Sequence, residues 1–186
     1  MNSQWIIIGV IFLFAMVLIP GRSKGANPYN KGKGTGSGTD LDSLSFLGNS
    51  AMPRGMRNNN PGNIEKSSSQ WKGKVPPDKN TDDRFEQFTA YVWGVRAMIR
   101  LIRDTYMITN GLQTIEEIIT KYAPGHENDT FSYIQAVSNQ SGYLAGEHLT
   151  PGYDELIKII PAMAYHENGR DAISDEMFQR AWELSI

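Results

Sequence analysis

The sequence contains the tripeptide His-Glu-Asn twice, at residues 126–128 and 166–168, although the whole chain has only 3 histidines. Histidine and glutamate are among the residues that most often transfer protons or bind metals in enzymes. Each copy could therefore belong to an active site. Each could equally consist of ordinary polar residues at the end of a helix.

Neither copy forms the zinc-binding pattern H-E-x-x-H, because the fifth position is Thr130 in the first copy and Arg170 in the second. A looser zinc site built from His126, His148 and His166 has no support in their spacing. The chain has no cysteine and lacks the G-x-S-x-G element of serine hydrolases. We therefore expect carboxylate chemistry, with no metal and no other cofactor.

Two glutamates are candidates for a general acid that cleaves a glycosidic bond, a reaction that requires a protonated carboxylic acid. Glu167 follows an apolar run at the end of an expected helix, where partial burial would raise the pKa of a carboxyl group. Its alternative role is that of a solvated residue before Gly169, which could end the helix. Glu127 precedes an expected helix, where an acidic residue also favours the helix dipole.

The composition predicts a folded chain without an electrostatic preference for nucleic acid. Of the 186 residues, 40% are hydrophobic and 20% are charged, which is enough apolar material for a packed core. The formal net charge is −2. A nearly neutral chain provides no general attraction to phosphate backbones, so we expect no nucleic-acid partner.

The chain divides into three predicted parts. Residues 5–20 are uncharged and almost wholly apolar, which predicts a single helix that anchors residues 1–21 in a lipid membrane. A cleaved signal peptide is the alternative, but it would have a basic start and a small-residue cleavage site. Residues 22–52 are rich in Gly, Ser and Lys and predict a flexible linker, and residues 53–186 predict one globular domain.

The globular domain is predicted to be mainly α with a small β element, an α+β fold. Two short strands are expected at residues 67–75 and 83–89, on either side of a polar turn that contains proline. Apolar residues at helical spacing predict helices over 91–108, 114–122, 128–138, 151–169 and 174–185. Three arginines of the first helix, Arg96, Arg100 and Arg103, share a face that we expect to be solvated.

An ordered series of motifs carries a family likeness. It begins with "RGMRNNNPGNI" at residues 54–64, continues through "RFEQF" and "YAPGHENDTFSYI", and ends with "HENG". The series resembles the structural protein P5-like family of phage virion proteins, which includes a murein-degrading lysin of an enveloped double-stranded RNA phage. The likeness covers residues 54–186. It implies a lysozyme-like fold and degradation of peptidoglycan when a phage penetrates or leaves its host.

A second similarity ranks the two glutamates. Lytic transglycosylases and related glucosaminidases have a glutamate at the end of an apolar helix, and "IIPAMAYHENG" at residues 159–169 is similar to that element. This similarity places Glu167 above Glu127 as the catalytic residue. In the glucosaminidases an Asn-rich segment follows the glutamate, whereas here it precedes Glu167, so the two similarities together imply a circular permutation.

The Asn-rich segment supplies the candidates for substrate binding, Asn58, Asn59, Asn60 and Asn63. Amide side chains donate and accept hydrogen bonds, which suits the N-acetyl and hydroxyl groups of a glycan. Asparagine also stabilises turns and tolerates left-handed backbone, so part of this set could serve the loop itself.

Together with the predicted anchor at residues 5–20, the resemblance implies a membrane-anchored, virion-associated enzyme that acts on the glycan strand of peptidoglycan, as a lytic transglycosylase or a lysozyme. Other virion proteins are further expected partners. The alternatives are a murein endopeptidase and a catalytically inactive structural or wall-binding virion protein. The alternative location is the host inner membrane, with the domain facing the periplasm.

Overall fold

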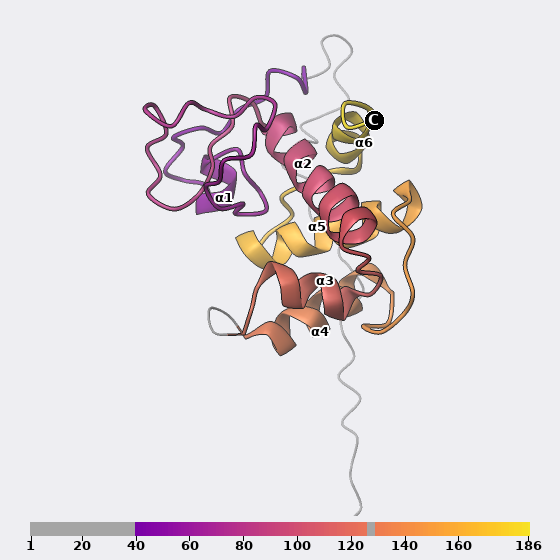
Figure 1. The fold of residues 1–186 in the computed structure, drawn as a ribbon. Coiled ribbons are helices and arrows are strands. Elements are labelled where there is room, and N and C mark those ends of the chain that lie inside the picture. The colour runs from indigo at the N-terminus through magenta and orange to yellow at the C-terminus, as the bar shows by residue number, and fades with distance from the viewer. Residues whose placement is uncertain (1–39, 126–128) are drawn as a thin grey trace, which may run out of the picture. The chain divides into compact units, whose positions relative to one another are not determined.

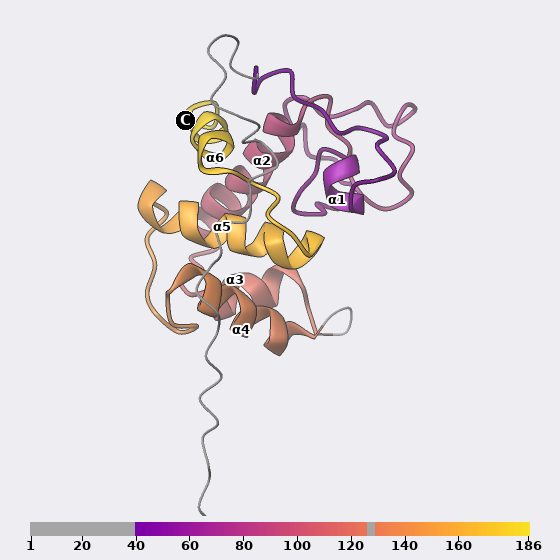
Figure 2. The same cartoon turned by 180° about the vertical axis from the view of Figure 1, so that it is seen from behind.

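The computed structural model describes residues 40–125 and 129–186. The helices of this part are α1 (Arg54–Arg57), α2 (Tyr91–Arg100), the π-helix η1 (Leu101–Thr109), α3 (Ile115–Tyr122), α4 (Thr130–Ser141), α5 (Tyr153–Asn168) and α6 (Asp175–Glu183). In the two opposite views of Figures 1 and 2, α5 lies between the α3–α4 pair and the region of α2 and α6. The helical content predicted from the sequence is confirmed.

The helices form where apolar residues recur at helical spacing, and these residues make up one core. In α3, Ile115, Ile118 and Ile119 are buried, while Thr114 and Glu117 form a capping box at its start. The longer helix α5 continues through Pro161 and buries much of its length. It ends at Gly169, whose φ of 66° is left-handed, as predicted for the residue that terminates the helix.

The helix predicted over residues 91–108 changes its winding halfway. After Arg100 the chain continues as the π-helix η1, a rare form with wider turns. The Thr109 hydroxyl donates to the Asp104 carbonyl at 2.7 Å within this segment. Tyr106 of this segment lies edge-on to Tyr122 of α3, with ring centroids 6.4 Å apart. Hydrophobic spacing alone contains no signal for this change.

The predicted β element was wrong, because no strand is found in the described part of the chain. Two isolated bridges, Glu65–Phe85 and Lys74–Phe88, stand where the strands were expected. The segment from Arg84 to Thr89 first bonds to the chain around Ile64, where the Glu86 amide donates to the Ile64 carbonyl at 2.9 Å. It then bonds to the chain around Val75, where the Val75 amide donates to the Gln87 carbonyl at 2.8 Å. Because this segment changes its bonding partner partway along, neither pairing continues long enough to form a β-ladder.

The fold class is therefore corrected from α+β to mainly helical. The anchor helix predicted for residues 5–20 lies outside the described residues. Within residues 40–125 and 129–186, no helix combines the length and the apolar character that crossing a membrane requires.

Residues 40–52, which the sequence assigned to the linker, pack against the domain. Arg180 of α6 donates to both carboxylate oxygens of Asp42, at 2.7 and 2.5 Å. The ring of Phe46 meets Tyr91 edge-on, with centroids 5.0 Å apart. The Phe46 amide donates to the Asn59 side chain at 2.7 Å. The start of the described chain thus contacts the Asn-rich segment directly.

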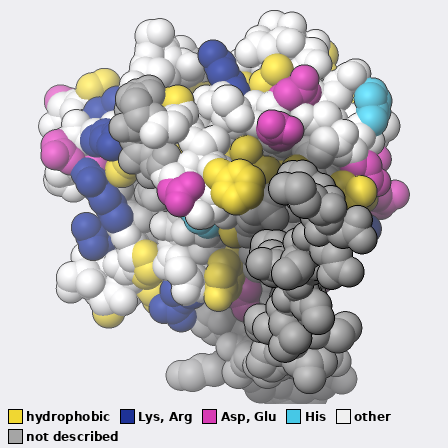
Figure 3. Space-filling view, turned by 90° about the horizontal axis from the view of Figure 1, so that it is seen from below, with side chains coloured by type: hydrophobic (Ala, Val, Ile, Leu, Met, Phe, Trp, Pro, Cys, Tyr) yellow, Lys and Arg dark blue, Asp and Glu magenta, His cyan; other side chains and the backbone are white. Residues whose placement is uncertain are grey.

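The arginine face of α2 and η1 binds the end of α6, instead of facing solvent as predicted. Arg96 donates to the Leu184 carbonyl at 2.7 Å, and Arg103 donates to the Ser185 carbonyl at 2.8 Å. Arg103 also lies over the ring of Trp182. Cationic side chains at a helix C-terminus satisfy its free carbonyls and favour its dipole. On the face drawn in Figure 3, basic side chains lie along one edge and acidic ones are present as well.

Asp82 organises the loops that replace the predicted strands. Its side chain is 7% exposed and accepts hydrogen bonds from Arg54 at 2.8 Å and from Asn58 at 2.7 Å. The amides of Arg84 and Phe85 also donate to it, at 3.0 and 2.8 Å. Burial alone would raise the pKa of this carboxyl, but these hydrogen bonds outweigh it and hold the pKa well below the usual range.

Replacing Asp82 by asparagine should lower the free energy of unfolding at pH 7 by about 2 kcal/mol, because a buried acceptor of several hydrogen bonds loses its charge. A carboxyl whose pKa is depressed by folding stabilises the protein above its unfolded pKa, which is about 3.9. The difference from wild type should therefore begin to shrink below about pH 4. Urea denaturation across this pH range measures it. Asp83→Asn is the control, since Asp83 is 90% exposed; an equal loss there would contradict the assignment.

Candidate active site around Glu167

The Asn-rich segment and the second His-Glu-Asn copy meet in the structure, although Asn63 and Glu167 are 104 residues apart in the chain. Glu167 lies in the last turn of α5 and is half-buried. The side-chain amide Nδ2 of Asn63 donates to Oε2 of Glu167 at 2.9 Å. The second His-Glu-Asn copy is thus joined to the Asn-rich segment through its glutamate. This contact defines the candidate site.

The residues on either side of Glu167 contact two other parts of the site. The His166 ring stacks on the Tyr133 ring of α4, with centroids 3.8 Å apart and planes 15° from parallel. Asn168 donates through Nδ2 to the Pro61 carbonyl at 2.8 Å and to the Ala164 carbonyl at 2.7 Å. The tripeptide therefore holds α5 to α4 on one side and to the Asn-rich segment on the other.

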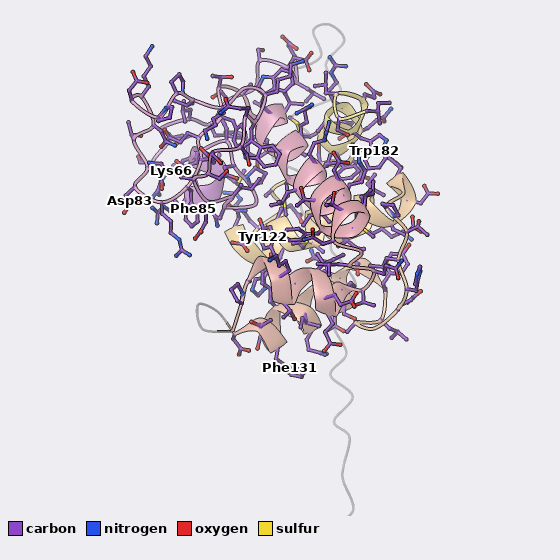
Figure 4. All side chains as sticks on the ribbon, in the orientation of Figure 1. Lys66, Asp83, Phe85, Tyr122, Phe131 and Trp182 are labelled. Atoms are coloured by element: carbon purple, nitrogen blue, oxygen red, sulfur yellow. The ribbon has the colours of Figure 1, made fainter. Side chains whose placement is uncertain are left out.

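Two tyrosine hydroxyls lie near the Glu167 carboxylate. Tyr122 of α3 donates to the Gly62 carbonyl, and Figure 4 shows it beside the C-terminal end of α5. Burial, followed by the charge of Glu167, raises the pKa of Tyr122 well above its usual value. Burial also raises the pKa of Tyr133, whose hydroxyl donates to the Met163 carbonyl at 3.3 Å, and the nearby charge of Glu167 adds to the effect. Both hydroxyls therefore stay protonated near neutral pH.

The four asparagines predicted to bind substrate separate into two groups. Asn58, Asn59 and Asn60 are at most 3% exposed, and their side-chain amides bond within the protein. Asn60, for example, donates to the Ile64 and Glu86 carbonyls at 2.9 and 3.0 Å. These three support the loop, which is the alternative that their residue type allowed. Asn63 is the member of the set that reaches Glu167.

Backbone geometry fixes this loop against α2. Asn59 and Asn63 adopt left-handed conformations, with φ of 52° and 48°, which asparagine tolerates better than most residues. The Asn59 carbonyl oxygen lies against Gly94 of α2, where any Cβ would overlap it. A glycine is required at position 94 because the two backbones approach so closely.

The first His-Glu-Asn copy, with the candidate Glu127, lies outside the described residues. Asp129 and Thr130 follow it, and Asp129 caps α4 by accepting from the Ser132 amide at 3.1 Å. Among the side chains that the structure describes, no group of three His, Cys, Asp or Glu residues is arranged to hold a metal.

A separate pocket lies among the loops before α2 and does not include Glu167. Its lining residues are Lys66, Ser67, Lys74, Pro77, Asn80 and Glu86. The buried Glu86 carboxylate pairs with Lys74 at 2.7 Å. Lys74 also donates to the Ser67 carbonyl at 2.7 Å, so its ammonium group is used within the protein. The charges of Lys74 and Glu86 in this pocket are therefore paired with each other.

Sequence reasoning missed three residues of the site. Tyr122 and Tyr133 follow the apolar spacing of their helices and so read as core residues, and nothing in the pattern shows that their hydroxyls face a carboxylate. Asn168 was part of the repeated tripeptide, which was its only available signal.

The comparison with known proteins adds one informative relative. The chain is 40% identical over 134 residues to Protein P5 of Pseudoalteromonas phage PM2, in an alignment that covers 70% of this chain and 80% of that protein. No general protein-family profile matches the sequence.

Proposed function

The chain belongs to the family of Protein P5 of Pseudoalteromonas phage PM2, and from that premise we propose that it is a phage enzyme that cleaves the glycan strands of peptidoglycan. The relative's name states no activity, so the proposal rests on the site. The observation that carries it is the half-buried Glu167 at the end of α5, whose carboxylate accepts a hydrogen bond from Asn63 at 2.9 Å.

A carboxyl group in this setting is suited to general acid catalysis. Its hydrogen-bonding partner is the neutral side-chain amide of Asn63, and the neutral hydroxyl of Tyr133, which donates to the Met163 carbonyl at 3.3 Å, lies nearby. A half-buried acid can donate its proton to a substrate oxygen while the helix holds it in position. The aromatic rings of Tyr133 and His166 form an apolar support beside it.

In the proposed reaction, Glu167 gives its proton to the glycosidic oxygen as the bond from that oxygen to the anomeric carbon breaks. The resulting carboxylate then takes a proton from the group that attacks the anomeric carbon. If water attacks, the product has a reducing end, as with lysozyme. If a hydroxyl of the same sugar attacks, the product is an anhydro sugar, as with lytic transglycosylases. One carboxylate is sufficient for the second route.

A murein-release assay tests the proposal. The full chain, added to purified dye-labelled murein, should release soluble coloured fragments, and heat-denatured protein should not. Because the wall chemotype of the host is not encoded in the site, murein from several cell-wall types is included. Absence of release from all of them would reject the enzyme and favour a structural or wall-binding protein.

The setting of the activity is part of the proposal. Phages meet peptidoglycan when they penetrate a host and when they leave it, and a protein carried by the particle would be present for the first event. We therefore infer that the protein is a component of the virion. Its partners are then peptidoglycan and other proteins of the particle.

A further inference from the structure

The contacts of the Asn63 side chain are not explained by substrate binding. Its Nδ2 donates to Oε2 of Glu167 at 2.9 Å. Its Oδ1 is buried, with no hydrogen-bond partner among the described residues. A buried atom cannot contact a glycan, so the amide faces inward on one side and towards the carboxyl group on the other.

We propose that Asn63 is a positioning residue, which holds Oε2 of Glu167 so that the acidic proton is carried on Oε1. The inference rests on the proposed function of Glu167 as general acid. An amide N–H can only donate, and the carbonyl oxygen of a protonated carboxyl group is a better acceptor than its hydroxyl oxygen. With Oε2 accepting from Asn63, the proton is favoured on Oε1, from which it can pass to the glycosidic oxygen.

Asn63 is itself held from two helices. The carbonyls of the two preceding residues accept hydrogen bonds, Pro61 from Asn168 of α5 at 2.8 Å and Gly62 from Tyr122 of α3. Asn63 follows these two anchored residues directly and has a left-handed backbone, with φ of 48°. Such support is what a group requires when it sets the orientation of a catalytic residue.

The Asn63 amide, which makes the hydrogen bond to Glu167, is closely packed. On the far side of the Asn63 amide, a Cβ placed on Gly55 would lie 3.0 Å from Asn63 Oδ1 and 2.6 Å from Asn168 Oδ1. This close packing leaves the Asn63 amide little room to move away from Glu167. Among the described residues, the hydroxyls of Tyr122 of α3 and Tyr133 of α4 feel the charge of Glu167, and His166 of α5 stacks on the Tyr133 ring.

Two substitutions keep the backbone and change the amide. Glycine and aspartate both tolerate a positive φ. Asn63→Gly should lower kcat on a soluble murein fragment on the order of 10²-fold, with little change in KM, because the carboxyl group loses its orientation. Asn63→Asp should keep part of the activity and move the alkaline limb of the pH–rate profile to higher pH, because one of two adjacent carboxyls retains its proton longer. Asn110→Gly, at an exposed position after η1, is the control.

A raised KM with unchanged kcat in Asn63→Gly would show substrate contact and overturn the proposal. So would an unshifted pH profile in Asn63→Asp. A second readout does not depend on activity: the side-chain NH₂ signals of Asn63 in NMR spectra should move with pH in the wild-type chain and stop moving in Glu167→Gln. If they are insensitive to pH in wild type, the contact with Glu167 and with it the positioning role fail. If they move with pH but the wild-type chain lyses no murein, the proposed function fails and the catalytic meaning of the contact falls with it.

Discussion

Glu167→Gln should lower the rate of murein lysis by about 10²–10⁴-fold, and by more if the residue acts in both steps of the reaction. Glutamine keeps the shape of the side chain and an oxygen that can accept from Asn63, but it has no acidic proton to give. The thermal unfolding temperature should stay close to that of wild type, because Glu167 is half-buried and its one geometrically defined partner is retained. Initial rates of fragment release, measured beside a melting curve, check both expectations.

Two further variants make this result specific. Glu176→Gln, at an exposed position in the first turn of α6, should lyse murein at the wild-type rate. Glu127→Gln tests the other candidate from the repeated tripeptide. If Glu167→Gln remains active and Glu127→Gln is inactive, the ranking of the two glutamates is reversed.

Gly94→Ala should destabilise the protein strongly, on the order of 3 kcal/mol, because the new Cβ would overlap the carbonyl oxygen of Asn59. In an open helix this substitution usually stabilises, by up to about 1 kcal/mol. The two effects have opposite signs, so the sign of the measured change decides whether the close approach of the Asn-rich loop to α2 exists. Urea denaturation of the wild-type and variant chains gives the difference in the free energy of unfolding.

Gly146→Ala is the matched control for this experiment. Gly146 is exposed, and a Cβ built there meets no atom within 4 Å, so its replacement should change stability little. If Gly94→Ala were as stable as wild type, or more so, the loop that positions Asn63 could not lie where the structure has it.

The helices could be predicted because their apolar spacing and end signals are local. The capping box of Thr114 and Glu117 and the terminating Gly169 were both visible in the sequence and are both present. The loops from Ile64 to Thr89 could not be predicted in the same way. Their order depends on single polar side chains such as Asp82, which bond to residues far along the chain and leave no periodic pattern.

The candidate site was predictable in its two motifs but not in how they pair. The repeated tripeptide drew attention to Glu167, and the run of asparagines drew attention to Asn63. Their hydrogen bond joins residues that are 104 positions apart in the chain. A single sequence does not show which of its distant residues lie close together in the fold. The same limit applies to Tyr122 and Tyr133, which are close to Glu167 only because α4 packs against α5 and α3 packs against α4. Membership of the phage P5-like family, predicted from the motifs, is confirmed by the relative in phage PM2.

The central claim, that Glu167 cleaves the glycan strand, is tested most directly by mass spectrometry of the fragments that the full chain releases from purified murein. The account predicts short glycan fragments with intact stem peptides, ending in either an anhydro or a reducing sugar, and their absence when Glu167→Gln replaces wild type. Fragments with newly exposed peptide termini on uncut glycan strands would contradict it and identify the protein as an endopeptidase.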